Sequence, residues 1–219
     1  MTLDPPGSIA VVGAGVLGLE AGLYGRFLGY DITVLEAGSI GQNLLPIDDE
    51  PPPVLPDQCL SPLAFSALAA QLEADPEASL ALPTTTNQWV HQGLIPLAAT
   101  DLLRGRVLAQ CRVTTILSVL VEADEEGEDN SDLPPDFQLT IVNGEASTEL
   151  RRVEAVILAT GQQCDISVEL ELPCPYFFQI GGTGGNDAAD LLEGRRQIVD
   201  LFAQLAGRND LDLYRPRRV

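Results

Sequence analysis

Three glycines and one glutamate near the start of the chain have the types and spacing to hold a dinucleotide. Gly13, Gly15 and Gly18 form the pattern G-x-G-x-x-G. Gly13 permits a tight turn, Gly15 lets backbone N–H groups approach a diphosphate, and Gly18 lets a helix lie close to a sheet. Glu36 follows at close to the spacing of roughly 20 residues typical of a ribose-binding carboxylate, which accepts both ribose hydroxyls and repels a 2′-phosphate.

Two strands and a helix are expected to position these residues. Residues 9–12 form an apolar run typical of a buried parallel strand, and residues 32–35 form a second one that ends at Glu36. Between them, a helix shows an apolar face made of Leu19, Leu23, Phe27 and Leu28. This order favours dinucleotide binding over a merely structural βαβ unit. The small residues of 37–43, AGSIGQN, suit a loop over the adenosine side of the ligand.

Composition and charge narrow the class of protein. The chain has 219 residues, an apolar fraction of 45%, a net charge of −20 and 12 basic residues that are all Arg. Such a charge disfavours nucleic-acid binding and indicates solubility rather than a specific basic protein partner. No run of 18 apolar residues predicts a membrane span, and MTLDPPGS lacks the features of a signal peptide. We therefore expect a cytoplasmic protein with one domain over residues 1–219.

Few side chains present themselves for acid–base, redox or metal chemistry. Cys59, Cys111, Cys164 and Cys174 include no C-x-x-C pair and are expected to be buried free thiols, with a chance meeting of Cys164 and Cys174 as the alternative. The only histidine is His91, which leaves no metal-ligand pattern and is expected to be an ordinary helical residue rather than a catalytic base. Trp89 is expected in the core or at its rim, with stacking on a cofactor ring as the alternative.

The middle of the chain predicts helices and then an antiparallel meander. The proline-rich stretch 46–56 is expected on the surface, and a helical excursion covers about 61–104. Ser61 and Thr86 are its expected N-caps, and Pro96 is expected to kink or divide it. The span of about 107–152 predicts a β-meander, with an acidic loop at 123–136 and a hairpin turn at Asn143-Gly144.

The last third of the chain predicts two more parallel strands and a long helix. Residues 153–159 form an apolar strand that ends at Thr160-Gly161, and residues 176–180 form the last strand. Residues 181–186, GGTGGN, are glycine-rich and join that strand to a helix over about 187–206. We interpret them as a backbone cradle for another part of the cofactor, with a simple turn as the alternative.

These pieces together resemble the two-dinucleotide-binding flavoproteins, especially the flavin-containing monooxygenase and thioredoxin-reductase-like group. The resemblance rests on segments that follow the family's order over nearly the whole chain: GAGVLG at 13–18 with Glu36, SIGQN at 39–43, CRVTTI at 111–116, ILATG at 157–161 and FQIGG at 178–182. It implies an α/β fold, an FAD/NAD(P)-binding Rossmann-like three-layer domain. A parallel sheet would carry helices on one face and the meander on the other.

The resemblance also implies the cofactor, FAD, and its contacts. The glycine loop would hold the FAD diphosphate and Glu36 the adenosine ribose, while Val113 would offer its backbone to adenine. The strand end at 159–161 and the last motif would follow the cofactor toward the flavin. The predicted cofactor-binding residues are Gly13, Ala14, Gly15, Val16, Leu17, Gly18, Glu36, Ala37, Gly41, Gln42, Val113, Ala159, Thr160, Gly161, Gly181 and Gly182.

Three departures from the family pattern bear on function. Gly182 stands where many members carry an Asp, and Gln42 replaces the second glycine of an I-G-G element. Only fourteen residues separate Gly161 from Tyr176, too few for the family's NAD(P)H-binding insertion. We expect an FAD-dependent oxidoreductase reduced by free NAD(P)H, a substrate or a protein redox partner. A non-catalytic module that binds FAD, ADP or NAD is the alternative, and a simple NAD-dependent dehydrogenase fits less well.

Overall fold

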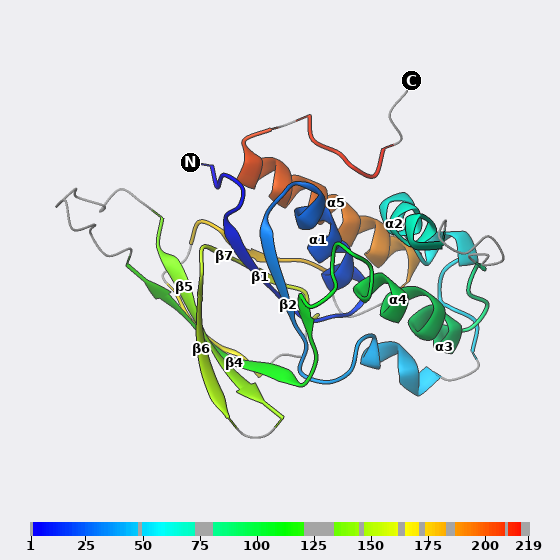
Figure 1. The fold of residues 1–219 in the computed structure, drawn as a ribbon, viewed down its shortest axis with the longest axis horizontal. Helices are drawn as coiled ribbons and strands as arrows, with labels where there is room; N and C mark the ends of the chain where they lie inside the picture. Colours follow the sequence, from blue (N-terminus) through cyan, green and yellow to red (C-terminus); the bar gives the residue numbers. More distant parts are fainter. Residues whose placement is uncertain are drawn as a thin grey trace.

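A parallel sheet forms the centre of the molecule (Figure 1). This computed structural model describes residues 2–47, 50–72, 81–120, 134–144, 147–161, 165–170, 174–182, 187–208 and 210–215. Within them the sheet has five strands in the order β3-β2-β1-β7-β9, all parallel. Their bounds are Ser8–Val12 for β1, Asp31–Leu35 for β2, Val107–Leu108 for β3, Ala155–Leu158 for β7 and Phe177–Gln179 for β9. The parallel sheet predicted from the apolar runs is confirmed.

The first βαβ unit forms as its residue pattern predicts. Strands β1 and β2 pair from Ser8 with Asp31 to Val12 with Leu35. Helix α1 (Val16–Phe27) connects them and buries Leu19 completely against the sheet. Phe27 was expected on the same buried face, but it is 46% exposed. The buried stripe therefore ends before the last residue of α1.

A second sheet holds the predicted meander. Strands β4 (Cys111–Val119), β5 (Asp136–Asn143) and β6 (Thr148–Val153) pair antiparallel in sequence order, which confirms the meander. A fourth strand, β8 (Ser167–Glu169), pairs parallel to β4 in the connection between Gly161 and Tyr176, where no strand was predicted. Apolar Ile166, Val168 and Leu170 alternate there with polar Ser167 and Glu169, a strand-like pattern that the prediction missed. The predicted acidic loop lies largely outside the described residues.

The two sheets and the helices form three layers. Helices α1 and α5 (Ala188–Ala206) pack together on one face of the central sheet, and the second sheet contacts β1, β2 and β7 (Figure 1). Helix α5 is tied to α1 by the stacked rings of Tyr24 and Phe202, with centroids 5.1 Å apart. The Asp187 side chain caps its start, and Gly207 ends it with a φ of 63°. This arrangement confirms the predicted three-layer α/β fold.

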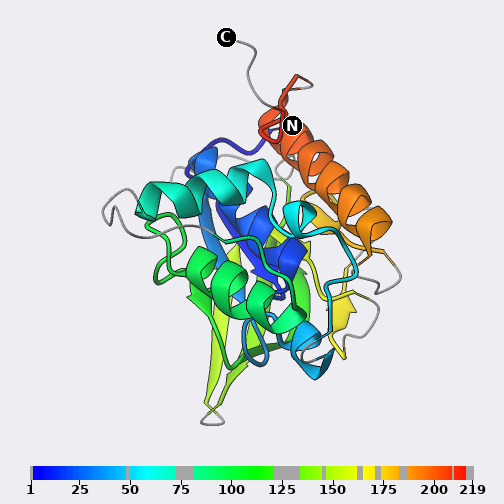
Figure 2. The same ribbon diagram turned by 90° about the vertical axis from the view of Figure 1, so that its right-hand side faces the viewer.

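The described residues of 61–104 contain four helical stretches, which lie beside α1 (Figure 2). They are α2 (Pro62–Leu72), α3 (Thr86–Gln88), a π-helical stretch η3 (Trp89–Leu94) and α4 (Ile95–Ala98). Two 3₁₀ turns precede them, η1 (Gln42–Ile47) and η2 (Pro56–Gln58). Ser61 caps α2 as predicted, because its Oγ accepts a hydrogen bond from the N–H of Ala64 at 3.0 Å.

Two details of this segment differ from the sequence prediction. Thr85, rather than Thr86, caps α3, because the Thr85 side chain accepts the N–H of Gln88. Pro96 does not divide the helical path, which continues from η3 into α4, but the helix changes from π to α geometry directly before it. Proline lacks an N–H and crowds the preceding turn, and the wider π turn directly before it accommodates that change.

Candidate functional site

Three glycines shape the loop between β1 and α1: two allow close backbone contacts, and one leaves an open space. Gly13 has a φ of 106°, and a Cβ there would lie 2.8 Å from the Ala159 carbonyl oxygen. A Cβ on Gly18 would lie 1.9 Å from the Gly13 carbonyl oxygen, so only glycine lets α1 start this close to the strand. At Gly15, by contrast, a Cβ would meet nothing within 4 Å. The space that a side chain would fill at Gly15 is therefore open.

The start of α1 faces this opening with its backbone. Gly15 is the N-cap residue, and no side chain caps the helix there. The first N–H groups of a helix lack intrahelical partners and carry the positive end of the helix dipole. An anionic group above Gly15 would meet these N–H groups without obstruction, which is the arrangement that binds a diphosphate.

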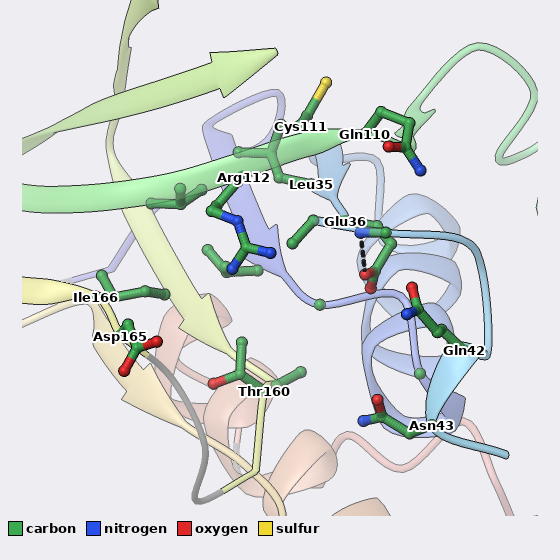
Figure 3. Close-up of a pocket in the computed structure, with 17 residues that line it drawn as sticks. Leu35, Glu36, Gln42, Asn43, Gln110, Cys111, Arg112, Thr160, Asp165 and Ile166 are labelled. Atoms are coloured by element: carbon green, nitrogen blue, oxygen red, sulfur yellow. Dashed lines mark hydrogen bonds between the residues drawn. The ribbon is translucent and has the colours of Figure 1, made fainter. Parts of the chain in front are cut away.

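A pocket of about 970 Å³ opens over the loop (Figure 3). Its walls come from the carboxyl ends of β1, β2 and β7, the start of β4 and the loops that follow them. The described residues that line it are Val12, Gly13, Gly15, Leu35, Glu36, Ala37, Gly38, Gln42, Asn43, Gln110, Cys111, Arg112, Val113, Ala159, Thr160, Asp165 and Ile166. This volume reaches the upper end of the range for small-molecule and cofactor sites.

Glu36 joins the end of β2 to the glycine loop. One carboxylate oxygen accepts the N–H of Ala14 at 2.7 Å, and the other accepts the N–H of Gly38 at 2.8 Å. Its own carbonyl accepts the N–H of Cys111, the first residue of β4, at 2.8 Å. The carboxylate is thus held at the pocket wall and keeps lone pairs for further donors, such as ribose hydroxyls.

The loop after Glu36 folds over itself and against the helical segment. The side-chain oxygen of Gln42 accepts the N–H of Ser39 at 3.1 Å, and a Cβ on Gly38 would lie 1.8 Å from that oxygen. Gly41 donates its N–H to the Ala14 carbonyl and packs against Val90. The helical segment therefore flanks the glycine loop through Gly41, while the described lining of the pocket comes from other segments.

The structure brings half of the predicted cofactor-binding residues to the pocket wall. The lining contains Gly13, Gly15, Glu36, Ala37, Gln42, Val113, Ala159 and Thr160. The other predicted residues lie behind the wall or away from it: Ala14, Val16, Leu17, Gly18, Gly41, Gly161, Gly181 and Gly182. Leu17, for example, packs against α5, where a Cβ on Gly194 would lie 2.3 Å from its Cδ1.

Sequence reasoning missed the residues that reach the pocket from the far side. Gln110, Arg112 and Asp165 line it, together with Gly38, Asn43, Cys111 and Ile166. The N–H of Gln110 bonds to the Gly38 carbonyl at 3.1 Å, which brings the start of β4 to the loop after β2. Residues 110–112 directly precede Val113, which was predicted to contact the cofactor. This position in the sequence could have indicated that they reach the same pocket, because neighbouring residues at one end of a strand lie close together.

The last strand-to-helix motif is closed by a side chain of α5. Gly181 has a φ of 81°, and its N–H donates to the Gln197 side-chain oxygen at 2.8 Å. Gly182 is exposed, and a Cβ there would lie 3.5 Å from the Asp190 carboxylate. Residues 183–186 lie outside the described chain, so the predicted cradle is described only at its two glycines.

Among His91 and the described cysteines, only Cys111 lines the pocket; Cys59 is buried, whereas Cys111 and Cys174 are half-buried. His91 is exposed on η3, and Trp89 is fully buried in the core as predicted. Burial raises the pKa of Cys59 to about 12, so this thiol is neutral at pH 7. In the described ranges no three His, Cys, Asp or Glu side chains gather to hold a metal. No helix there is long and apolar enough to cross a membrane.

No protein-family model and no curated protein sequence matches the chain. Among solved structures, it is similar to an oxidized steroid monooxygenase bound to NADP, with 23% identity and a TM-score of 0.45 over 71% of this chain and 26% of that one. It is similar to OTEMO in complex with FAD and NADP, with 18% identity and a TM-score of 0.46 over 72% and 26%. It is also similar to the bacillithiol disulfide reductase Bdr (YpdA) from Bacillus cereus, with 20% identity and a TM-score of 0.42 over 71% and 40%. The chain thus spans about a quarter of the length of the two monooxygenase structures.

Proposed function

We propose that the chain is an FAD-binding oxidoreductase of the flavin-containing monooxygenase-like group, with no nicotinamide-binding domain inserted between β7 and β9. The observation that carries this proposal is the open space above Gly15, where a Cβ would meet nothing within 4 Å at the uncapped start of α1. A diphosphate fits this cradle by charge and by shape. The solved structures of steroid monooxygenase and OTEMO are described with NADP and FAD, in line with this class of ligand.

Different residues of the pocket would contact different parts of the cofactor. The N–H groups at Gly15 would hold the diphosphate, and Glu36 would accept the ribose hydroxyls while the N–H of Ala14 keeps its carboxylate in place. Val113 lies at the wall next to the ribose position, where its backbone can meet the adenine. When bound, the flavin supplies the redox chemistry, and the protein supplies its position and its electrostatic surroundings.

The proposed oxidoreductase needs an electron source other than a nucleotide-binding domain inserted between β7 and β9. Strands β7 and β9 pair directly, from Val156 with Phe177 to Leu158 with Gln179. The connection between them has no length for a second nucleotide domain, so reduction would come from free NAD(P)H, from a substrate or from a protein redox partner. The free thiols of Cys59, Cys111 and Cys174 suit a reducing compartment, and we place the activity in the cytoplasm.

One observation favours a second function, a dinucleotide-binding module without turnover. The N–H of Gly181 is already occupied by Gln197, and neither Gly181 nor Gly182 is among the described lining residues. The described pocket thus offers more contacts to the adenosine and diphosphate of a dinucleotide than to a flavin. Such a module would hold FAD, ADP or NAD as a ligand or as a part of a larger assembly.

An absorption spectrum separates the two functions. The purified protein is incubated with excess FAD, desalted, and its flavin bands are measured against protein concentration. An oxidoreductase is expected to retain close to one flavin per chain and to lose the visible band on anaerobic addition of NADH or NADPH, with recovery in air, whereas a module that holds FAD without turnover keeps the band. A protein that binds ADP and retains no flavin contradicts the proposed oxidoreductase and supports the module.

A further inference from the structure

One arginine at the pocket differs from the others in the described chain. All of the chain's 12 arginines except those at 217 and 218 lie in described residues. Arg112 is the one among them whose side chain has no hydrogen bond or ion pair with any described residue. The others donate to carboxylates or to backbone carbonyls, as Arg106 does to Asp31 and Arg26 to the Tyr30 carbonyl.

The unpaired guanidinium points into the pocket. Figure 3 shows it directed toward the glycine loop, between Glu36 on one side and Thr160 and Asp165 on the other. Arg112 is the only basic residue among the described lining residues, where it stands with two carboxylates. Among the described residues of a chain of net charge −20, this cation without a protein partner therefore lines the same pocket as the open space at Gly15.

A β-bulge gives Arg112 this direction. The pairing of β4 with β5 shifts between Val113 and Thr115, so Thr114 is an extra residue in the strand. Side chains alternate along a regular strand, and without the bulge Arg112 would share a face with the fully buried Ile116. The bulge instead places Val113 on the buried face with Ile116 and turns Arg112 to the opposite one.

We propose that Arg112 pairs with the diphosphate of a bound dinucleotide or nucleoside diphosphate. This assignment uses the pocket of the proposed function but requires only a diphosphate ligand, not a flavin. A guanidinium presents planar paired donors that match phosphate oxygens, and it would add a full charge to the partial charge of the α1 terminus. The role makes Arg112 a determinant of preference for phosphorylated ligands over the bare nucleoside.

The test compares ligands with and without phosphates. ADP and adenosine are titrated calorimetrically into the wild type, Arg112→Gln, Arg112→Lys and the control Arg196→Gln. Arg196 lies on α5, is 68% exposed, and its loss changes the net charge by the same amount. Arg112→Gln is expected to weaken ADP binding about tenfold or more, the loss of one charge-assisted hydrogen bond, and to change adenosine binding less than about twofold. Arg112→Lys is expected to fall between Arg112→Gln and the wild type.

The outcomes distinguish this proposal from the proposed function. Equal ADP affinity in Arg112→Gln and the wild type overturns the role of Arg112, as does a wild type that binds no ADP. Equal weakening of ADP and adenosine also overturns it and assigns the guanidinium to the base instead. FAD is titrated in parallel. A wild type that binds ADP but not FAD contradicts the proposed flavoprotein, whereas the comparison of Arg112→Gln with the wild type still tests whether Arg112 contacts the diphosphate. A thermal melt of each variant shows whether it is folded.

Discussion

Glu36 performs two tasks at the scale of a single residue. Its carboxylate accepts the N–H groups of Ala14 and Gly38, so it fixes the glycine loop and the following loop before any ligand binds. The same oxygens face the pocket, where ribose hydroxyls can donate to them. A side chain that is already held loses little conformational entropy when it binds a ligand, which is the advantage of preorganisation.

The role of Glu36 predicts a graded response to substitution. Glu36→Ala is expected to weaken ADP or FAD binding by about 1–2 kcal/mol, because the ribose loses charged acceptors. Glu36→Gln keeps one carbonyl acceptor and is expected to lose less. Isothermal titration measures both variants, and the ratio of 2′-phospho-ADP to ADP affinity is expected to rise in each as the repelling charge is removed. Unchanged ADP affinity in Glu36→Ala would remove this residue from the site.

At the scale of the elements, one buried carboxylate joins four segments. Glu20 on α1 is 1% exposed and accepts the N–H and the hydroxyl of Ser61 at 3.0 and 2.6 Å, at the start of α2. Arg195 on α5 lies 3.5 Å from it, and the Tyr214 hydroxyl lies 3.3 Å away. Burial and the Glu20 charge raise the pKa of Tyr214 well above its ordinary value, so its hydroxyl stays protonated and donates.

This cluster predicts a large and non-additive effect on stability. Glu20→Ala is expected to lower the free energy of unfolding by about 3–5 kcal/mol, because it leaves the largely buried Arg195 without its counter-charge. Arg195→Met alone is expected to be destabilising, and the double variant is expected to lose less than the two single losses together. Urea unfolding measures all three, with Glu193→Gln on the exposed side of α5 as the control, which is expected to change little. Strict additivity would show that Glu20 and Arg195 do not interact.

The elements that were predictable are those whose pattern is local. Apolar periodicity and glycine spacing predict the strand, glycine loop and helix at 8–27. The apolar stripe of α5 and Gly207 at its end mark that helix in the same way. Strand β8 was missed although Ile166, Val168 and Leu170 alternate with polar residues, because the strand is short and its partner β4 is distant in sequence. Leu192 belongs to the apolar pattern of α5 in the sequence but is 55% exposed. Periodicity identifies the apolar face of a helix, but it does not show which residues of that face a neighbouring element covers.

The same division holds for the site. The loop and Glu36 follow one another in sequence, so their association could be read from spacing. Arg112 and Asp165 reach the pocket only because β4 and the segment after β7 meet there, which depends on tertiary structure. The bulge at Thr114 reverses the direction of Arg112 relative to a regular strand, and no residue pattern in the sequence marks it.

At the scale of the whole molecule, charge is the dominant feature. The chain carries 32 acidic residues against 12 arginines. Ion pairs such as Arg152–Asp136 and Arg151–Glu149 engage several of the arginines, and 12 arginines are too few to pair with 32 carboxylates. A net charge this far from zero keeps a protein soluble but opposes its compact state by self-repulsion.

Salt is therefore expected to stabilise the protein. Raising NaCl from about 0.02 to 0.5 M shortens the screening length from roughly 20 Å to about 4 Å, which weakens repulsion across the surface more than it weakens close ion pairs. Calorimetry is expected to show a melting temperature several degrees higher, since about 1 kcal/mol corresponds to roughly 2–4 °C at this chain length. KCl at equal ionic strength is expected to give the same rise, which separates screening from specific sodium binding. A fall in melting temperature with either salt would mean that the surface ion pairs, rather than the excess of carboxylates, govern the electrostatic part of its stability.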